Sequence, residues 1–102
     1  MAFDFQLWHA KVPDFKVPAC VPDDLNTRYK HLCDFINVKP DETIEAALEE
    51  VFLQTQNTSE GAWSEGERST SVGDLIVLLH PVSEVGVAIY CVAPSGFFTL
   101  FE

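Results

Sequence analysis

The sequence is short of basic residues: 6 Lys and Arg stand against 16 Asp and Glu, and the formal net charge is -10. A protein that binds nucleic acid through the phosphate backbone needs clustered Lys and Arg, so this balance argues against direct nucleic-acid binding. The shortage is also uneven, because no basic residue lies between Lys39 and Arg68. A partner attracted by such a surface would be a basic protein.

Other features are missing as well. No apolar run approaches the roughly 20 residues that a membrane-spanning helix needs, and residues 1–8 carry no basic residue of the kind that begins a secretory signal. Three cysteines, Cys20, Cys33 and Cys91, are odd in number and show no Cys-x-x-Cys pair or metal-ligand spacing. We therefore expect reduced thiols packed in the core of a cytoplasmic protein, with no membrane contact, no metal and no other cofactor.

What the chain does have is enough apolar material for one domain over residues 1–102: 47% of its residues are hydrophobic and 12% are aromatic. Alternating apolar and polar residues predict a strand over 1–12, and helical spacing predicts helices over 24–37 and 41–56. A polar loop over 57–70 then leads to a three-stranded meander over 71–102. The order β-α-α-β-β-β predicts an α+β fold, an antiparallel sheet with two helices packed on one face.

The chain is organised around the apolar run Leu75–Leu79, which is short, branched and suited to the central strand of the sheet. Residues 68–74, immediately before it, read Arg-Ser-Thr-Ser-Val-Gly-Asp. Gly73 can take a positive φ without strain, and the side chains of Ser71 and Asp74 can accept hydrogen bonds from backbone N–H groups. These three residues predict a structural turn at the entry to the strand.

A resemblance to a known family rests on an ordered set of short motifs in the second half of the chain. The set comprises Leu48-Glu49-Glu50-Val51-Phe52, Asn57, Arg68-Ser69-Thr70-Ser71-Val72-Gly73-Asp74-Leu75-Ile76, Tyr90-Cys91-Val92 and Gly96-Phe97. In this order the motifs resemble small YodL-like domains and related proteins carried by bacteriophages, plasmids and other mobile elements. The resemblance implies a prokaryotic or phage-infected cytoplasm, and it implies no particular activity.

Catalytic side-chain types do occur near the turn. Ser69, Ser71, Asp74 and His80 include a nucleophile, a base and an orienting group, but no Gly-x-Ser-x-Gly elbow presents either serine. The alternative is that the hydroxyls and Asp74 satisfy backbone groups of the turn and anchor Arg68. The 3 histidines are dispersed along the chain. We therefore predict no catalytic residue and a protein that is not an enzyme.

Two further side chains have both a binding and a structural interpretation. The guanidinium of Arg68 could contact a carboxylate or phosphate of a ligand, or it could form an ion pair with Asp74 or a neighbouring Glu. Trp63, in an otherwise polar loop, could anchor an interface, or it could fold back and complete the core.

The acidic residues of the second predicted helix carry the sharpest functional hypothesis. Glu45 and Glu49 are four residues apart, roughly 6 Å along a helix axis, and like-charge neighbours of this kind do not stabilise a helix. The proposed binding surface, defined by its shared negative charge, consists of Glu42, Glu45, Glu49 and Glu50, with Glu65 and Glu67 nearby. Such a row could imitate a phosphate backbone, or it could be an ordinary solvated face.

Together these features predict a small, acidic protein-binding module that acts in the cytoplasm. We expect a phage or mobile-element accessory protein that binds or inhibits a basic host protein. Mimicry of a nucleic acid is one way in which it could do so. The first alternative is a structural or regulatory domain that associates with itself into a homo-oligomer, and the second is an enzyme.

Overall fold

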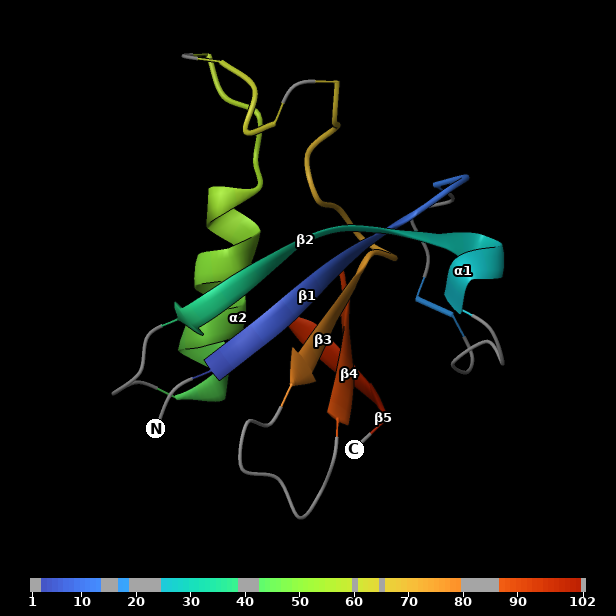
Figure 1. The fold of residues 1–102 in the computed structure, drawn as a ribbon, viewed down its shortest axis with the longest axis vertical. Helices are drawn as coiled ribbons and strands as arrows, with labels where there is room; N and C mark the ends of the chain where they lie inside the picture. The colour runs from blue at the N-terminus through green and yellow to red at the C-terminus, as the bar shows by residue number, and fades with distance from the viewer. Residues whose placement is uncertain are drawn as a thin grey trace.

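The computed structural model describes residues 3–13, 17–18, 25–38, 43–59, 61–64, 66–79 and 87–101. Its elements, in chain order, are β1 (Phe3–Ala10), α1 (Leu25–Arg28), β2 (Tyr29–Val38), α2 (Ile44–Gln54), β3 (Leu75–Leu79), β4 (Val87–Val92) and β5 (Phe97–Phe101) (Figure 1). The α+β class predicted from the sequence is confirmed. The order of elements differs from the expected β-α-α-β-β-β by one strand, β2, between the two helices.

The strands form one antiparallel sheet in the order β2-β1-β3-β4-β5. β3 is its central strand, as the apolar run Leu75–Leu79 predicts, and its first four residues are buried. The three C-terminal strands are consecutive neighbours, so the predicted meander is present. β1 lies between β2 and β3 and therefore joins the first part of the chain to the last.

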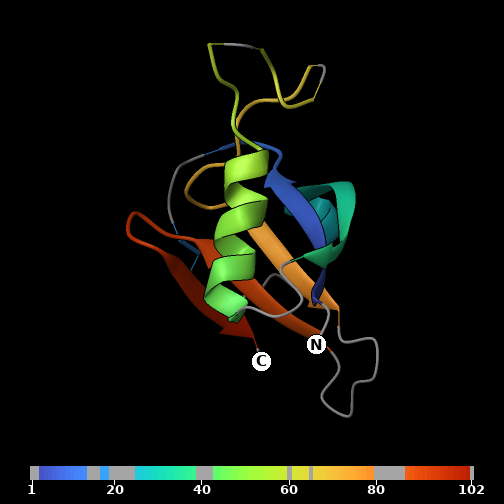
Figure 2. The ribbon, with the colours of Figure 1, turned by 90° about the vertical axis from the view of Figure 1, so that its left-hand side faces the viewer.

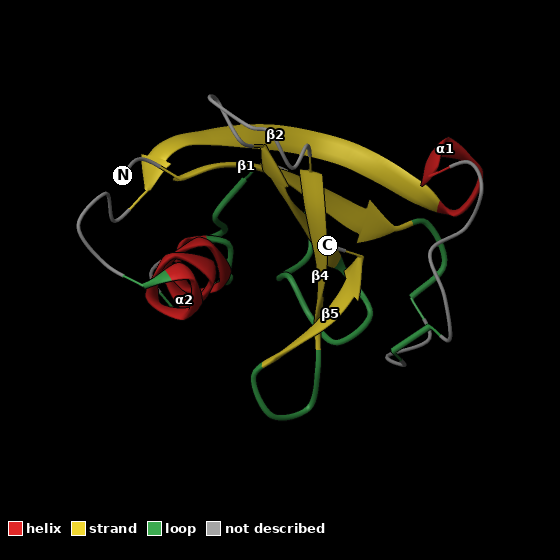
Figure 3. Ribbon diagram, turned by 90° about the horizontal axis from the view of Figure 1, so that it is seen from below, coloured by secondary structure: helices red, strands yellow, loops and turns green. Residues whose placement is uncertain are grey.

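α2 covers one face of the sheet (Figure 2). Its buried residues Ala47, Leu48 and Val51 belong to the same core cluster as seven buried residues of the strands: Phe5, Leu7, Ile76, Leu78, Ala88, Tyr90 and Val92. The opposite face buries a second cluster that includes Leu75, Val77 and Ile89. The expectation that both helices share a face does not hold, because Leu25 of α1 packs against this second cluster. Figure 3 shows α1 at the end of β2, away from α2.

The helix predicted over 24–37 is wrong for most of its length, because only Leu25–Arg28 is helical and Tyr29–Val38 is a strand. The error has a physical origin in two register shifts between β1 and β2. Phe3 and Phe5 of β1 are two residues apart, but their partners on β2 are three residues apart. Leu7 and Trp8 are adjacent, but their partners on β2 are two residues apart. Each extra residue on β2 lengthens the period-two alternation of a strand to a spacing of three, which imitates a helix.

The second predicted helix is present with shorter bounds, Ile44–Gln54 in place of 41–56. Thr43 is its N-cap, and the Thr43 hydroxyl accepts a hydrogen bond from the Ala46 N–H at 3.2 Å. A Thr in this position satisfies one of the N–H groups that the first turn leaves without a helical partner. The start expected at Asp41 lies outside the described residues.

Two of the three cysteines can be placed. Cys33 and Cys91 are free thiols, and Cys91 is fully buried whereas Cys33 is half-buried. Burial, assisted by the nearby Asp34 carboxylate, raises the pKa of the Cys33 thiol. Cys33 is therefore held in its less reactive protonated form. Cys20 lies outside the described residues.

Candidate functional site

The motif at residues 68–74 forms an ion pair between the half-buried Arg68 and the buried Asp74. Arg68 Nη1 donates to Asp74 Oδ2 at 2.6 Å, and Arg68 Nη2 donates to Asp74 Oδ1 at 2.7 Å. The same carboxylate accepts the backbone N–H groups of Ala10 (2.9 Å) and Ser71 (2.8 Å). Asp74 is only 1% exposed, so these four donors satisfy a carboxylate that is otherwise removed from water. The ion pair expected as the structural alternative for Arg68 is present.

Arg68 also holds the loop to β1. Its Nη2 donates to the Ala10 carbonyl at 3.2 Å, and its Nη1 lies 3.0 Å from the Ser69 carbonyl and 3.1 Å from the Ser71 hydroxyl. Hydrogen bonding to Asp74 raises the pKa of the guanidinium, against the opposing effect of burial. The donors that a ligand would use are thus engaged inside the protein.

His9 of β1 completes this buried cluster. Its Nε2 lies 2.8 Å from the Thr70 hydroxyl and 3.8 Å from Asp74 Oδ2, and the residue is 3% exposed. Among the described buried side chains, His9 Nδ1 has no hydrogen-bond partner. Burial lowers the pKa of His9 in spite of the nearby Asp74 carboxylate. A neutral ring that carries its proton on Nε2 fits this geometry best, because an unpaired buried N–H costs more than an unpaired lone pair.

The turn ahead of β3 has the backbone that its sequence indicates. Gly73 has a φ of 98°, which lies in the left-handed region that residues with a Cβ avoid. The Gly73 N–H donates to the Val92 carbonyl at 3.0 Å, and the Val92 N–H donates to the Asp74 carbonyl at 2.9 Å. The turn therefore aligns β3 with β4 and directs the Asp74 side chain toward Arg68.

The catalytic types noted in the sequence do not form a reaction centre within the described part of the chain. The Ser69 hydroxyl accepts the Asn57 N–H at 2.7 Å, and the Ser71 hydroxyl accepts from Arg68. Asp74 and His9 are closed off from solvent. His80 lies outside the described residues. The hydroxyls and the carboxylate thus serve the turn, in agreement with the structural alternative.

Trp63 packs inward. It is half-buried against the α2-side core, and its Nε1–H donates to the Arg68 carbonyl at 2.7 Å. Its ring meets that of His9 edge to face, with centroids 6.0 Å apart. The structure therefore favours the packing interpretation of Trp63 over the interface anchor.

The acidic residues predicted to form one binding surface are separated by the fold. Glu45 and Glu49 are exposed on one flank of α2, whereas the helical advance of about 100° per residue places Glu50 on the other flank. Glu50 accepts a hydrogen bond from Gln54 Nε2 at 2.7 Å. Glu67 pairs with Lys30 of β2 at 3.2 Å, so its charge is already partnered. Glu42 and Glu65 lie outside the described residues.

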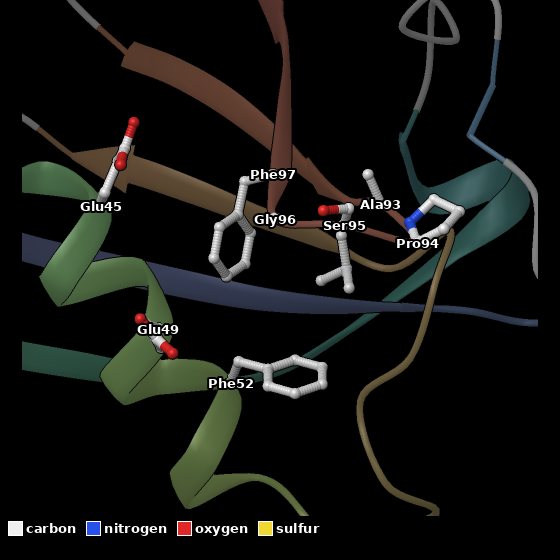
Figure 4. A pocket seen from close by; sticks show the side chains of 9 residues that line it. Glu45, Glu49, Phe52, Ala93, Pro94, Ser95, Gly96 and Phe97 are labelled. Carbon is white, nitrogen blue, oxygen red and sulfur yellow. The ribbon is translucent and has the colours of Figure 1, made fainter.

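Glu45 and Glu49 line a groove of about 510 Å³ between α2 and the β4–β5 turn. Phe52 and Phe97 supply aromatic surface in the groove, and their rings meet edge to face with centroids 6.5 Å apart. The far wall is the turn, residues 93–96. Figure 4 shows the two carboxylates on the helix and Phe97 across from them. We refer to this site as the acidic groove.

The acidic groove has the chemistry of a cation site. Neither Glu45 nor Glu49 forms an ion pair with any described residue, so both charges remain available. An ammonium or guanidinium group is attracted both by carboxylates and by the faces of aromatic rings. The sequence pattern does not reveal this site, because Phe97 and the β4–β5 turn are far from α2 in the sequence and only the folded sheet brings them beside it.

Two negative findings bear on other classes of site. Within the described ranges, no group of three His, Cys, Asp or Glu residues is placed to hold a metal ion. The helices that the structure describes are also too short or too polar to cross a membrane.

In comparisons with protein-family models, curated proteins and solved structures, no match to the chain was found.

Proposed function

We propose that the protein is a small, acidic, non-enzymatic binding module whose acidic groove takes a Lys or Arg side chain of a basic protein partner. The observation that carries this proposal is the pair of exposed carboxylates, Glu45 and Glu49, beside the aromatic surface of Phe52 and Phe97. Charges satisfied within a protein stabilise its structure, whereas charges left in a concave site are available to a ligand.

The biological setting of the proposal rests on the resemblance to YodL-like domains at residues 48–52 and 68–76. It is that of a phage or mobile-element accessory protein that binds or inhibits a host protein in the bacterial cytoplasm. Mimicry of a nucleic acid is the form of inhibition that a net charge of -10 favours. A host protein that binds nucleic acid would bring the Lys and Arg side chains that the acidic groove attracts.

The proposal is tested by capture from bacterial lysate followed by quantitative binding. The wild-type protein, the double variant Glu45→Gln/Glu49→Gln and the control variant Glu50→Gln are immobilised, and the captured protein is purified and titrated against each. We expect the double variant to weaken binding at least about tenfold and the control to bind like the wild type. Binding should also weaken between low salt and about 0.5 M salt, because exposed charges are screened.

Retention of full affinity by the double variant, at both salt concentrations, would overturn the proposal. The control separates the acidic groove from general acidity, since Glu50→Gln removes one carboxylate charge from the other flank of α2 and each groove carboxylate contributes one. A structural domain that associates with itself is the second candidate, because an open strand edge such as that of β5, described below, can also pair with a second copy.

A further inference from the structure

β5 forms one edge of the sheet, and no described residue pairs with its outer side. Its sequence is Phe-Phe-Thr-Leu-Phe, with no charge and no proline. The backbone N–H and C=O groups on the outer side of such a strand can pair with another extended chain. Figure 2 shows β5 at the outer edge of the sheet, beside α2.

The other edge of the sheet is built differently. β2 carries the charged side chains of Lys30 and Asp34, and two register shifts interrupt its pairing with β1. Charges and bulges are the devices that prevent unwanted strand addition at a sheet edge. The single shift in the pairing of β5 falls near its C-terminal end and leaves Phe97, Phe98 and Thr99 in regular register with β4. Of the two sheet edges formed by the described strands, the β5 edge is the one that carries neither a charged side chain nor a bulge in its first three residues.

The side chains of β5 define what an added strand would meet on each face. Phe97 points into the acidic groove, toward α2. Phe98 is on the opposite face and is 53% exposed, and Leu100 lies on that same face, where it packs against the second cluster. Neighbouring strands lie about 4.8 Å apart, and successive side chains alternate between the faces. A strand beside β5 would therefore place every second side chain on the α2 side of the sheet, the side of Glu45 and Glu49, and the others on the side of Phe98.

We propose that the partner binds as an added β-strand on the open edge of β5, through an extended segment in which basic and apolar residues alternate. The inference rests on the proposed function and specifies how the basic partner is recognised. Backbone hydrogen bonds to β5 supply the pairing, the basic side chains enter the acidic groove, and the apolar side chains cover Phe98.

Charge decides between this occupant and a second copy of the chain. Two copies that each carry a net charge of -10 repel each other. A second β5 also contains no Lys or Arg and would leave Glu45 and Glu49 without a counter-charge. A basic, alternating segment satisfies both the edge and the acidic groove.

The test uses synthetic peptides, so that it does not depend on a captured partner. The parent peptide alternates Lys and Val, and a control of the same composition has all its Lys residues in one block. Two further peptides are N-methylated, one on every Lys and the other on every Val. In an extended strand the N–H groups of alternate residues point to opposite sides, so only one of the two methylated peptides loses its hydrogen bonds to β5.

We expect the parent peptide to bind at least about tenfold more tightly than the block control, as measured by calorimetry. One methylated peptide should lose at least about tenfold and the other should bind like the parent. Amide hydrogen exchange of β5 should slow on binding. The variant Phe98→Thr should weaken the parent peptide while the acidic groove stays intact.

The outcomes separate the two proposals. If both methylated peptides bind like the parent but Glu45→Gln/Glu49→Gln abolishes binding, the acidic groove is a cation site and strand addition is wrong. If the double variant binds the parent peptide as the wild type does, the proposed function itself fails. Sedimentation of the free protein as a dimer that Phe98→Thr dissociates would show that a second copy occupies the edge, and would also overturn the inference.

Discussion

The cluster formed by Asp74, Arg68 and His9, here named the Asp74 cluster, and the acidic groove use carboxylates in opposite ways. Asp74 is buried and accepts four hydrogen bonds from donors within the chain. Glu45 and Glu49 are exposed and have no ion-pair partner among the described residues. A carboxylate whose donors all come from its own chain stabilises the fold, and one without them is free to act on another molecule. Mutation of Asp74 should therefore change stability, whereas mutation of Glu45 and Glu49 should change binding.

Asp74→Ala should produce the largest loss of stability, about 3–5 kcal/mol. The substitution leaves the half-buried Arg68 guanidinium and the N–H groups of Ala10 and Ser71 without their acceptor. Chemical denaturation measures the change. A free energy of unfolding within about 1 kcal/mol of the wild type would show that water replaces the carboxylate at little cost, and the contrast between the two regions would disappear.

Gly73→Ala should cost about 1–2 kcal/mol, because a Cβ is disfavoured at a φ of 98°. Ser95→Ala, at an exposed position of the β4–β5 turn, is the matched control and should change stability by under about 0.5 kcal/mol. Equal denaturation midpoints for the two variants would contradict the strained turn at Gly73.

The Asp74 cluster should also make stability depend on pH. Burial lowers the pKa of His9 below 6.5, an effect that Arg68 and Lys30 assist and that Asp74 and Glu67 oppose. The unfolded chain then binds more protons than the native protein as the pH falls below about 6.5, so stability should decrease over that range. Urea denaturation at a series of pH values measures the slope. His9→Gln should flatten it, and an unchanged slope in this variant would assign the pH dependence to other groups.

The smallest effect on stability belongs to the acidic groove. Glu45→Gln/Glu49→Gln should change the free energy of unfolding by under about 0.5 kcal/mol, since both side chains are exposed and unpaired within the described residues. The same variant is expected to lose partner binding. A marked change in stability would show that these carboxylates have a structural role, and their contrast with Asp74 would not hold.

Local sequence patterns predicted the parts of the fold that depend on neighbours in the chain. The α+β class, the central position of β3 and the C-terminal meander follow from short apolar runs and turns. β2 was missed because its bulged pairing with β1 gives its apolar residues a helical spacing. The strand conformation of this segment results from its tertiary pairing with β1, which no local sequence pattern contains.

The candidate site divides along the same line. The link between Arg68 and Asp74 could be anticipated, because the two residues lie in one motif and have complementary charges. The acidic groove could not, since it needs the distance between α2 and the β4–β5 turn, which the sheet sets. Glu45 and Glu49 were named from the sequence, but Phe52, Phe97 and the open edge of β5 were not.

The position of β1 between β2 and β3 has a consequence for folding during synthesis. β1 is synthesised before the other described strands, yet its pairing with β3 and the hydrogen bond from the Ala10 N–H to Asp74 require a residue 64 positions later in the chain. Contacts of such long sequence separation slow folding, because a long loop must close before they form. Until then, β1 has no partner strand on its β3 side, and an unpaired strand edge of this kind makes a partly folded chain prone to aggregation.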